Sequence, residues 1–445
     1  MNRKLLYSLL IPGLLIIVRP LGMNVAQSIV LATLLATIAW WVTGVVNRTI
    51  ASLLMLTVFS VLGNTPLDRI FQFPLSANFI LIVLSFVFSE GIMNSGLADK
   101  LILPILQKGS RTIHQLLIMI SALTLALIFV IPQPFSRIII LGMLLNQFFR
   151  RSDLEEPLIK VLLLYTFLSA VIMNISFLRG DIILNHAFIA FSQMEITELQ
   201  WAKVMLAPSG VLLIVSYCMF QFLFRKELGT YRYAEKEMTL EKLTKEDKRN
   251  LMVIAAVVIL WAAEPFHGVS ATLIILMGTA LMGLFKMITL KDLKAVNLEL
   301  LLFITAAFSI GVVMNYSGIA AIVLHPLSTL LPGEFGITYV LVVMVMSMLM
   351  HMMLGSNITT LSVVIPSLTL MSAGVAPPYM LMFTIYVSVC AHYILPFHNV
   401  VILLGNGKSF YNSKTVAKFG IPLTGALVIL ILGIYYPWWK FIGLA

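Results

Sequence analysis

Long apolar runs recur along this chain, and they constrain its fold more than any other feature. Examples are LLYSLLIPGLLIIV at residues 5–18 and SIVLATLLATIAWWV at residues 28–42. An α-helix rises about 1.5 Å per residue, so about 20 apolar residues cross the roughly 30 Å hydrocarbon layer of a membrane. Of the 445 residues, 60% are hydrophobic and only 11% are charged, which is too few charges for a water-facing surface. The sequence therefore predicts an all-α polytopic membrane protein.

The positions of the runs predict about 11 transmembrane helices and two re-entrant hairpins. The expected helices cover residues 5–19, 25–43, 50–63, 77–96, 159–192 (broken), 203–224, 250–264, 269–286, 299–316, 379–406 (broken) and 419–438. Turn or polar residues interrupt the segments 113–149 and 337–372, and their arms are too short to span a membrane comfortably. We therefore interpret these two segments as hairpins.

The two halves of the chain are similar in sequence, which indicates an internal duplication. Residues 78–106 align with 299–327, 135–146 with 355–366, and 177–188 with 396–407. Internal repeats are typical of secondary transporters, whose substrate site lies where the two copies meet. We divide the chain into an N-terminal helix (1–24), a first repeat (25–224), a charged cytoplasmic linker (225–249) and a second repeat (250–445).

The basic residues predict how the repeats are oriented. With the N-terminus in the cytoplasm, only Arg19, Arg69, Lys203 and Lys440 fall outside and most other Lys and Arg residues fall inside, as the positive-inside rule requires. The first hairpin then enters from the inside and the second from the outside, so the repeats are inverted. We expect a multi-pass protein of the cell (inner) membrane with its C-terminus outside. The net charge of +10 then reflects cytoplasmic loops, and we expect no nucleic-acid partner.

Polar residues interrupt the second repeat at two places. The second hairpin turns at LGSNITT (354–360), where Ser356, Asn357 and Thr359 supply hydroxyl and amide groups. Such groups coordinate a cation, or bind an anion together with the free N–H groups of a helix N-terminus. The plainer alternative is that they only cap a helix. Pro396 breaks the following helix and frees carbonyl oxygens that bind a hard cation.

These segments resemble the divalent anion/sodium symporters, a family that carries dicarboxylates, citrate or sulfate. The similar stretches cover most of the chain and include residues 39–63, 261–284, 356–366 (the Ser-Asn-Thr signature) and 395–407 (the second broken helix). The resemblance implies a homodimer and elevator-type alternating access, in which a domain of hairpins and broken helices moves. It also implies that Ser356, Asn357 and Thr359 bind the substrate and a sodium ion, with backbone near Pro396 completing the shell of the ion.

The first repeat departs from the family pattern at the matching hairpin. Where the family has a second Ser-Asn-Thr, this chain has Ser136, Arg137 and Ile138, and an arginine does not lose its charge in a protein. Three interpretations of Arg137 stay open: an ion pair with Asp181 or Glu90, an anchor for a substrate carboxylate, sulfate or phosphate, or a built-in replacement for sodium. We expect Ser136 and Arg137 at the substrate, and a reduced or altered dependence on sodium.

Further ionisable residues lie near the broken helices. Arg179 is expected to border the substrate cavity, although Asp181 is so near in sequence that an ion pair between them is the alternative. Glu90 and Asp181 are candidates for binding or coupling a cation. His392 and His398 flank the second break. They either titrate near neutral pH, His392 in ion coupling and His398 at the substrate, or pack between helices.

We expect a secondary transporter, a symporter or an exchanger, for a small anion such as a dicarboxylate, another organic anion or sulfate. The sequence has no P-loop, zinc-ligand spacing or nucleophile elbow. We therefore predict neither an enzyme nor an ATP-driven pump, with no metal site and no cofactor beyond a coupling Na+ or H+. The expected partners are the anion, the lipid bilayer and a second copy of the chain. The alternatives are a cation/proton antiporter or arsenite-type extruder on a related scaffold, and a non-transporting membrane sensor or accessory protein.

Overall fold

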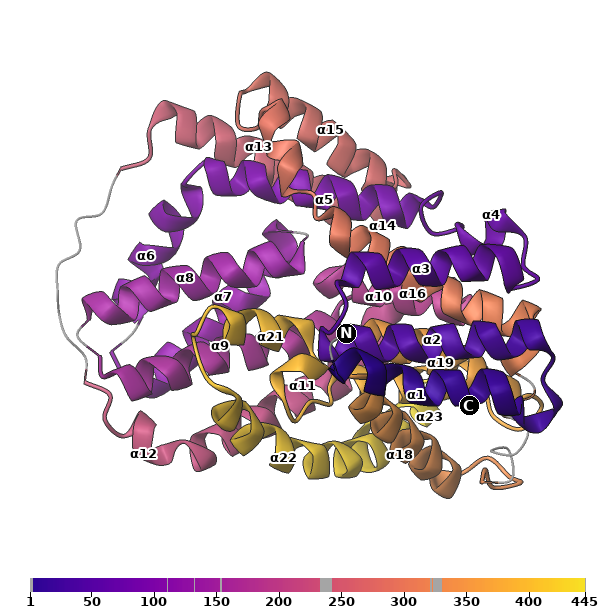
Figure 1. Cartoon of the computed structure of the whole chain (residues 1–445). Helices are drawn as coiled ribbons and strands as arrows, with labels where there is room; N and C mark the ends of the chain where they lie inside the picture. Colours follow the sequence, from indigo (N-terminus) through magenta and orange to yellow (C-terminus); the bar gives the residue numbers. More distant parts are fainter. Residues whose placement is uncertain are drawn as a thin grey trace.

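The fold is known from a computed structural model, which describes residues 3–109, 111–131, 133–152, 154–232, 242–320, 322 and 330–444. All regular elements in these ranges are helices, so the all-α prediction is confirmed (Figure 1). The first half contains α1 (Arg3–Val18), η1 (Pro20–Gly22), α2 (Val25–Thr43), α3 (Arg48–Leu62), α4 (Leu67–Ile70), α5 (Ala77–Asn94), α6 (Leu97–Gly109), α7 (Ile113–Val130), α8 (Pro134–Arg151), α9 (Glu156–Ser176), η2 (Leu178–Asp181), α10 (Leu184–Ser192), α11 (Glu198–Leu223) and α12 (Arg225–Leu228). The second half contains α13 (Lys245–Ala262), α14 (Glu264–His267), α15 (Ala271–Leu284), η3 (Leu290–Ala295), α16 (Leu298–Tyr316), α18 (Ile337–Leu354), α19 (Asn357–Met371), α20 (Pro378–Cys390), η4 (Pro396–His398), α21 (Val400–Gly407), α22 (Ser413–Leu430), η5 (Ile431–Tyr435) and α23 (Tyr436–Phe441).

Several helices have the length and composition of membrane spans. In the part of the chain that the structure describes, four are long and apolar enough to cross a membrane: α7, α9, α11 and the continuous run Ser413–Phe441. Shorter apolar helices such as α2, α5 and α16 accompany them. The chain is thus a multi-pass membrane protein. In the first expected hairpin, α7 is with 18 residues among these candidate spans by length and composition, and the re-entrant hairpin stays a prediction.

The two hairpins approach the centre of the molecule from opposite ends. In Figure 1, α7 and α8 occupy the left half of the view and α18 and α19 the right half. The broken helices α9–η2–α10 and α20–η4–α21 pack against them: α8 contacts α9 and α21, while α19 contacts α10 and α20. Burial is most complete along α9 and α20, where almost every side chain is shielded. The candidate functional site lies where these helices meet.

Small residues let the helices approach closely where they cross. Lipid chains are as apolar as leucine, so helices in a membrane associate mainly through packing and hydrogen bonds. A Cβ atom at Gly142 in α8 would lie 2.9 Å from the Phe410 ring and 3.0 Å from the Phe167 ring. At Gly420 in α22 it would lie 2.2 Å from the carbonyl oxygen of Tyr393. These two glycines therefore fix how closely α8 and α22 approach the broken helices.

The charged linker is partly helical. Within 225–249, α12 covers Arg225–Leu228, residues 233–241 lie outside the described part, and α13 begins at Lys245, earlier than the expected position 250. Thr244 and Asp247 form a capping box that starts α13. Lys100 donates a hydrogen bond of 2.8 Å to the Asp247 carboxylate. This bond, with those from Thr244, lowers the pKa of Asp247 to about 2. The linker is thereby attached to α6.

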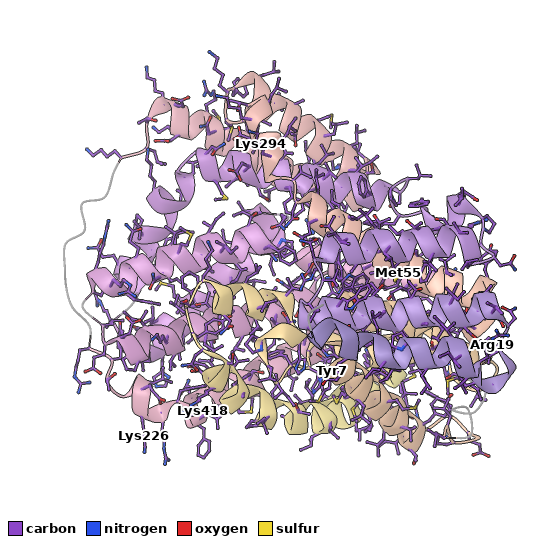
Figure 2. All side chains as sticks on the ribbon, in the orientation of Figure 1. Tyr7, Arg19, Met55, Lys226, Lys294 and Lys418 are labelled. Atoms are coloured by element: carbon purple, nitrogen blue, oxygen red, sulfur yellow. The ribbon has the colours of Figure 1, made fainter. Side chains whose placement is uncertain are left out.

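Arg19 lies at the opposite end of the molecule from Lys226 and Lys418. Figure 2 shows Arg19 at the right edge of the view, and Lys226 and Lys418 at the lower left edge. Arg19 was assigned to the outside, and Lys226 and Lys418 to the cytoplasm, by the positive-inside rule. These ends therefore correspond to the two sides of the membrane in the predicted topology. Which end faces the cytoplasm stays a prediction.

Candidate functional site

Four helix N-termini converge on one small cavity. Its lining includes Phe135 from the first turn of α8, Leu184 from α10, Asn357 from α19 and Val400 from α21. The cavity has a volume of about 30 Å³, enough for one or two water molecules. A helix N-terminus carries partial positive charge and unpaired N–H groups, so it attracts anions. The convergence of four such ends makes the cavity a favourable place for negative charge.

Three of the four N-termini are capped by side chains of their own segments. Gln133 accepts a hydrogen bond from the first turn of α8. Asp181 accepts from the first turn of α10 at 2.9 and 3.1 Å, and Asn399 from the first turn of α21 at 3.0 and 3.4 Å. Ser356, at the same position before α19, makes no such bond. The N–H groups of α19 are therefore the ones that remain open to a ligand.

The caps also define how the two broken helices correspond. Asp181 and Asn399 occupy the same place, since each accepts N–H groups two and three residues later at the start of a helix. The alignment of residues 177–188 with 396–407 instead paired Asp181 with Val400 and was wrong by one position. The correction matters because it places a carboxylate in the first break where the second has a neutral amide. Both side chains line the cavity.

Polar atoms at the second hairpin tip are buried without ordinary hydrogen bonds. Asn357 is 4% exposed, and its amide makes no hydrogen bond of ordinary length and angle to a described residue, although the His351 imidazole and the Cys390 thiol lie close enough to interact with it. The hydroxyl of Thr359, in the first turn of α19, is also buried and has no hydrogen-bond partner among the described residues. Burying an amide without a hydrogen bond costs free energy, so such atoms mark a place where a ligand completes the structure. Asn357 lines the cavity and has the open geometry expected of a binding residue.

The Arg137 guanidinium is held by three oxygen atoms. It donates to the carbonyl of Ile131 at 2.8 Å, to the side-chain oxygen of Asn174 at 2.8 Å and to the carbonyl of Gly180. The side chain is buried. In the described ranges no carboxylate lies within 4 Å of Arg137, so the ion pair with Asp181 or Glu90, one of the three interpretations, is not formed. The charge of Asp181 still attracts that of Arg137.

Arg179 has a different partner from the one expected. Its Nε lies 3.4 Å from the Glu198 carboxylate, and its guanidinium donates to the Trp261 carbonyl at 3.4 Å. The charge also lies over the rings of Phe129 and Trp261, at 5.8 and 5.3 Å from their centroids. The alternative ion pair between Arg179 and Asp181 is therefore wrong. Arg179 joins η2 to α11 and α13, and it is absent from the residues that line the cavity.

Three buried histidines surround the second break. The ring centroid of His351 lies 5.6 Å from those of both His392 and His398. His351 Nε2 donates to the His398 carbonyl at 2.8 Å, so the proton resides on Nε2. His398 Nδ1 accepts two backbone N–H groups. His392 is buried and neither of its ring nitrogens has a partner in the described part.

The predicted site residues are only partly brought to the cavity. Asn357 and Asp181 line it. The other predicted residues adjoin this lining or lie farther off: Ser136, Arg137, Arg179, Ser356, Thr359, Pro396, His392, His398 and Glu90. Ser136 and Ser356 are neighbours of lining residues in sequence, whereas Glu90 belongs to α5 and is absent from the lining.

Sequence reasoning missed several polar residues of the site. Asn174, Cys390 and Asn399 line the cavity, and His351 contacts the second break. The first break is closed by Asn185, whose amide donates to three carbonyls and accepts from a tyrosine hydroxyl. Amide side chains within apolar segments were the available signal. Such residues are rare at membrane depth and usually have a partner or a ligand.

The chain was also compared with known proteins. A family model described as the sodium:sulfate symporter transmembrane region matches residues 2–445, almost the whole chain. No curated protein matches the sequence. The region of the family match includes both hairpins, both broken helices and every residue of the cavity.

Proposed function

The chain belongs to the sodium:sulfate symporter family, a family of secondary anion transporters, and we propose that its own substrate is a small oxyanion bound at the cavity between the hairpins. The resemblance to divalent anion/sodium symporters that the sequence indicated is thereby confirmed. The proposed substrates are a dicarboxylate, another organic anion or sulfate. A homodimer in the cell membrane, with a cytoplasmic N-terminus, is part of the same proposal.

The observation that carries this proposal is the open N-terminus of α19 beside the unpaired amide of Asn357. Four positive helix ends meet there, and only this one lacks a side-chain cap. An oxyanion needs hydrogen-bond donors, and the first-turn N–H groups with the Asn357 amide nitrogen provide them. The Thr359 hydroxyl is a further donor within the same turn.

The size of the cavity supports a moving mechanism. A cavity of about 30 Å³ is small for a dicarboxylate, so we expect the hairpin tips to separate when the substrate enters. In an elevator mechanism the hairpins and broken helices move together relative to the remaining helices, and the site reaches each side of the membrane in turn. The close packing of α8 on α9 and of α19 on α20 suits motion as one body.

Replacing Asn357 by alanine tests the proposal. A hydrogen bond to a charged group contributes about 1.5–3 kcal/mol, so Asn357→Ala is expected to weaken anion uptake by roughly tenfold to a hundredfold. Folding stability should not fall, because the substitution removes a buried amide that makes no ordinary hydrogen bond to a described residue. Uptake of labelled sulfate and succinate into proteoliposomes, with the melting temperature of the purified protein, measures both effects.

Ser362→Ala is the matched control for Asn357→Ala. Ser362 is another buried polar residue of α19, but its hydroxyl bonds to the carbonyl of Thr359 within the helix. Its uptake should match that of the wild type. Unchanged uptake in a folded Asn357→Ala protein would contradict the assigned site, and no uptake of any tested oxyanion by the wild type would contradict the substrate class.

A further inference from the structure

Backbone carbonyls are normally left open where a transmembrane helix is broken. In transporters with such helices, these carbonyls coordinate the coupling cation. At the first break of this chain they already accept hydrogen bonds from side-chain N–H groups. The amide of Asn185 donates to the carbonyls of Asn174, Phe177 and Leu178. The indole N–H of Trp201 donates to the carbonyl of Ile175, and the guanidinium of Arg137 donates to the carbonyl of Gly180.

The atoms around the Arg137 guanidinium have the composition of a cation site. Two are backbone carbonyls, from Ile131 and Gly180, and one is the side-chain oxygen of Asn174. Neutral carbonyl and amide oxygens are the ligands that hard cations take. They also come from three separate segments, the end of the first hairpin arm, α9 and η2, so the packed fold brings them to one point.

The positive charge at this point is attracted by a carboxylate that is not in contact with it. Asp181 lies near enough for its charge to attract that of Arg137, and both side chains are at most 5% exposed. A sodium ion placed among the same oxygens would meet the guanidinium at close range, and like charges repel strongly away from water. Among the residues that the structure describes, no carboxylate pairs with Arg137 directly, so its charge is held by neutral oxygens, as a bound metal ion would be.

The second repeat shows the contrasting arrangement. Asn357 aligns with Arg137 in the two hairpins, and its amide makes no hydrogen bond of ordinary length and angle to a described residue. The His398 carbonyl corresponds to that of Gly180 and accepts from the imidazole of His351. The second repeat therefore has unpaired polar atoms at this position, whereas the guanidinium of Arg137 occupies the matching position in the first repeat.

We propose that Arg137 is a tethered cation, which occupies the oxygen cage of Ile131, Asn174 and Gly180 in place of a bound metal cation such as Na+. The first repeat then needs no coupling ion, and the carrier retains this positive charge in both directions of transport. The proposal rests on the proposed anion transport for its role. The occupied cage itself is independent of which anion is carried.

Replacing Arg137 by asparagine opens the cage and restores the residue type of the second repeat. The melting temperature of the purified protein is measured against NaCl and choline chloride at equal ionic strength, with no oxyanion present. A ligand that binds only the folded state stabilises it. Above the dissociation constant, this stabilisation grows with the logarithm of the ligand concentration. Arg137→Asn is expected to show a larger Na+-specific rise than the wild type.

Two controls separate the cage from a general loss of charge. Arg179→Asn removes another buried arginine but leaves the cage occupied, and it should respond to Na+ as the wild type does. Arg137→Lys retains a positive charge and should also show no added response. A folded Arg137→Asn protein with the Na+ response of the wild type would overturn the proposal, as would an equal gain in Arg179→Asn.

The wild type provides a second test if Arg137→Asn does not fold. With the first site occupied by Arg137, anion uptake should depend on Na+ with a Hill coefficient of about one or less. A coefficient of two or more would overturn the proposal, because it requires a second bound ion. The melting experiment needs no transport, so a failure of the proposed function leaves its result interpretable. Anion uptake without the Na+ gain in the variant would contradict the tethered cation alone.

Discussion

Asn185 is expected to be among the most costly polar residues of the protein to remove, although it does not line the cavity. Its amide nitrogen lies 2.9 Å from the carbonyl oxygens of Asn174 and Phe177 and 3.0 Å from that of Leu178. Its amide oxygen accepts the hydroxyl of Tyr386. An amide has two N–H groups, so the three carbonyls share two full hydrogen bonds. Asn185→Ala leaves these carbonyls buried in the broken helix without the donor that they have now.

The magnitude follows from the partners that are lost. Two buried carbonyls without donors cost about 1–3 kcal/mol each, which gives about 2–6 kcal/mol. Side-chain hydrogen bonds within membrane proteins average about 0.6 kcal/mol, so two bonds to the carbonyls and one from Tyr386 give a smaller figure of about 2 kcal/mol. Tyr386→Phe removes only the hydroxyl and is expected to cost about 1 kcal/mol.

Unfolding in mixed micelles, followed by circular dichroism, compares the two variants with the wild type. Asn185→Ala should lose at least twice the unfolding free energy that Tyr386→Phe loses. Equal losses would refute the reasoning, because they would mean that water or a shifted backbone satisfies the carbonyls of the break.

Two further outcomes are expected. Gly180→Ala should lower stability by about 1–3 kcal/mol, because its Cβ would lie 2.3 Å from the Asn174 carbonyl oxygen. Gly210→Ala in α11 has open space at its Cβ and should raise stability by up to about 1 kcal/mol. Similar melting temperatures for the two variants would contradict this. The folded pKa of Asp247, about 2, lies below its ordinary value of 3.8, so its bond to Lys100 stabilises the protein above pH 3.8 and is lost as the pH falls to 2. The melting temperature of Asp247→Asn should therefore fall less over that range, and a parallel decline in both proteins would argue against the assignment.

The sequence predicted the features that depend on local composition. Apolar runs identified the helices, since a membrane selects segments by length and hydrophobicity. The interruptions at 354–360 and at Pro396 indicated the second hairpin tip and the second break, and α19 and η4 begin there. The contrast between Arg137 and its counterpart Asn357 in the second repeat was visible in the sequence, as was the unusual character of a charge among apolar residues.

Only the tertiary structure decided which partners the buried polar groups have. Arg137 bonds to Asn174, 37 residues away, and Asn185 to Tyr386, 201 residues away. Arg179 pairs with Glu198 and not with nearby Asp181, whose carboxylate caps α10. A buried polar group bonds to whichever acceptor the packed helices bring within about 3 Å, and proximity in sequence does not determine that distance. Local composition therefore located the site, and helix packing determined that a guanidinium occupies the first oxygen cage.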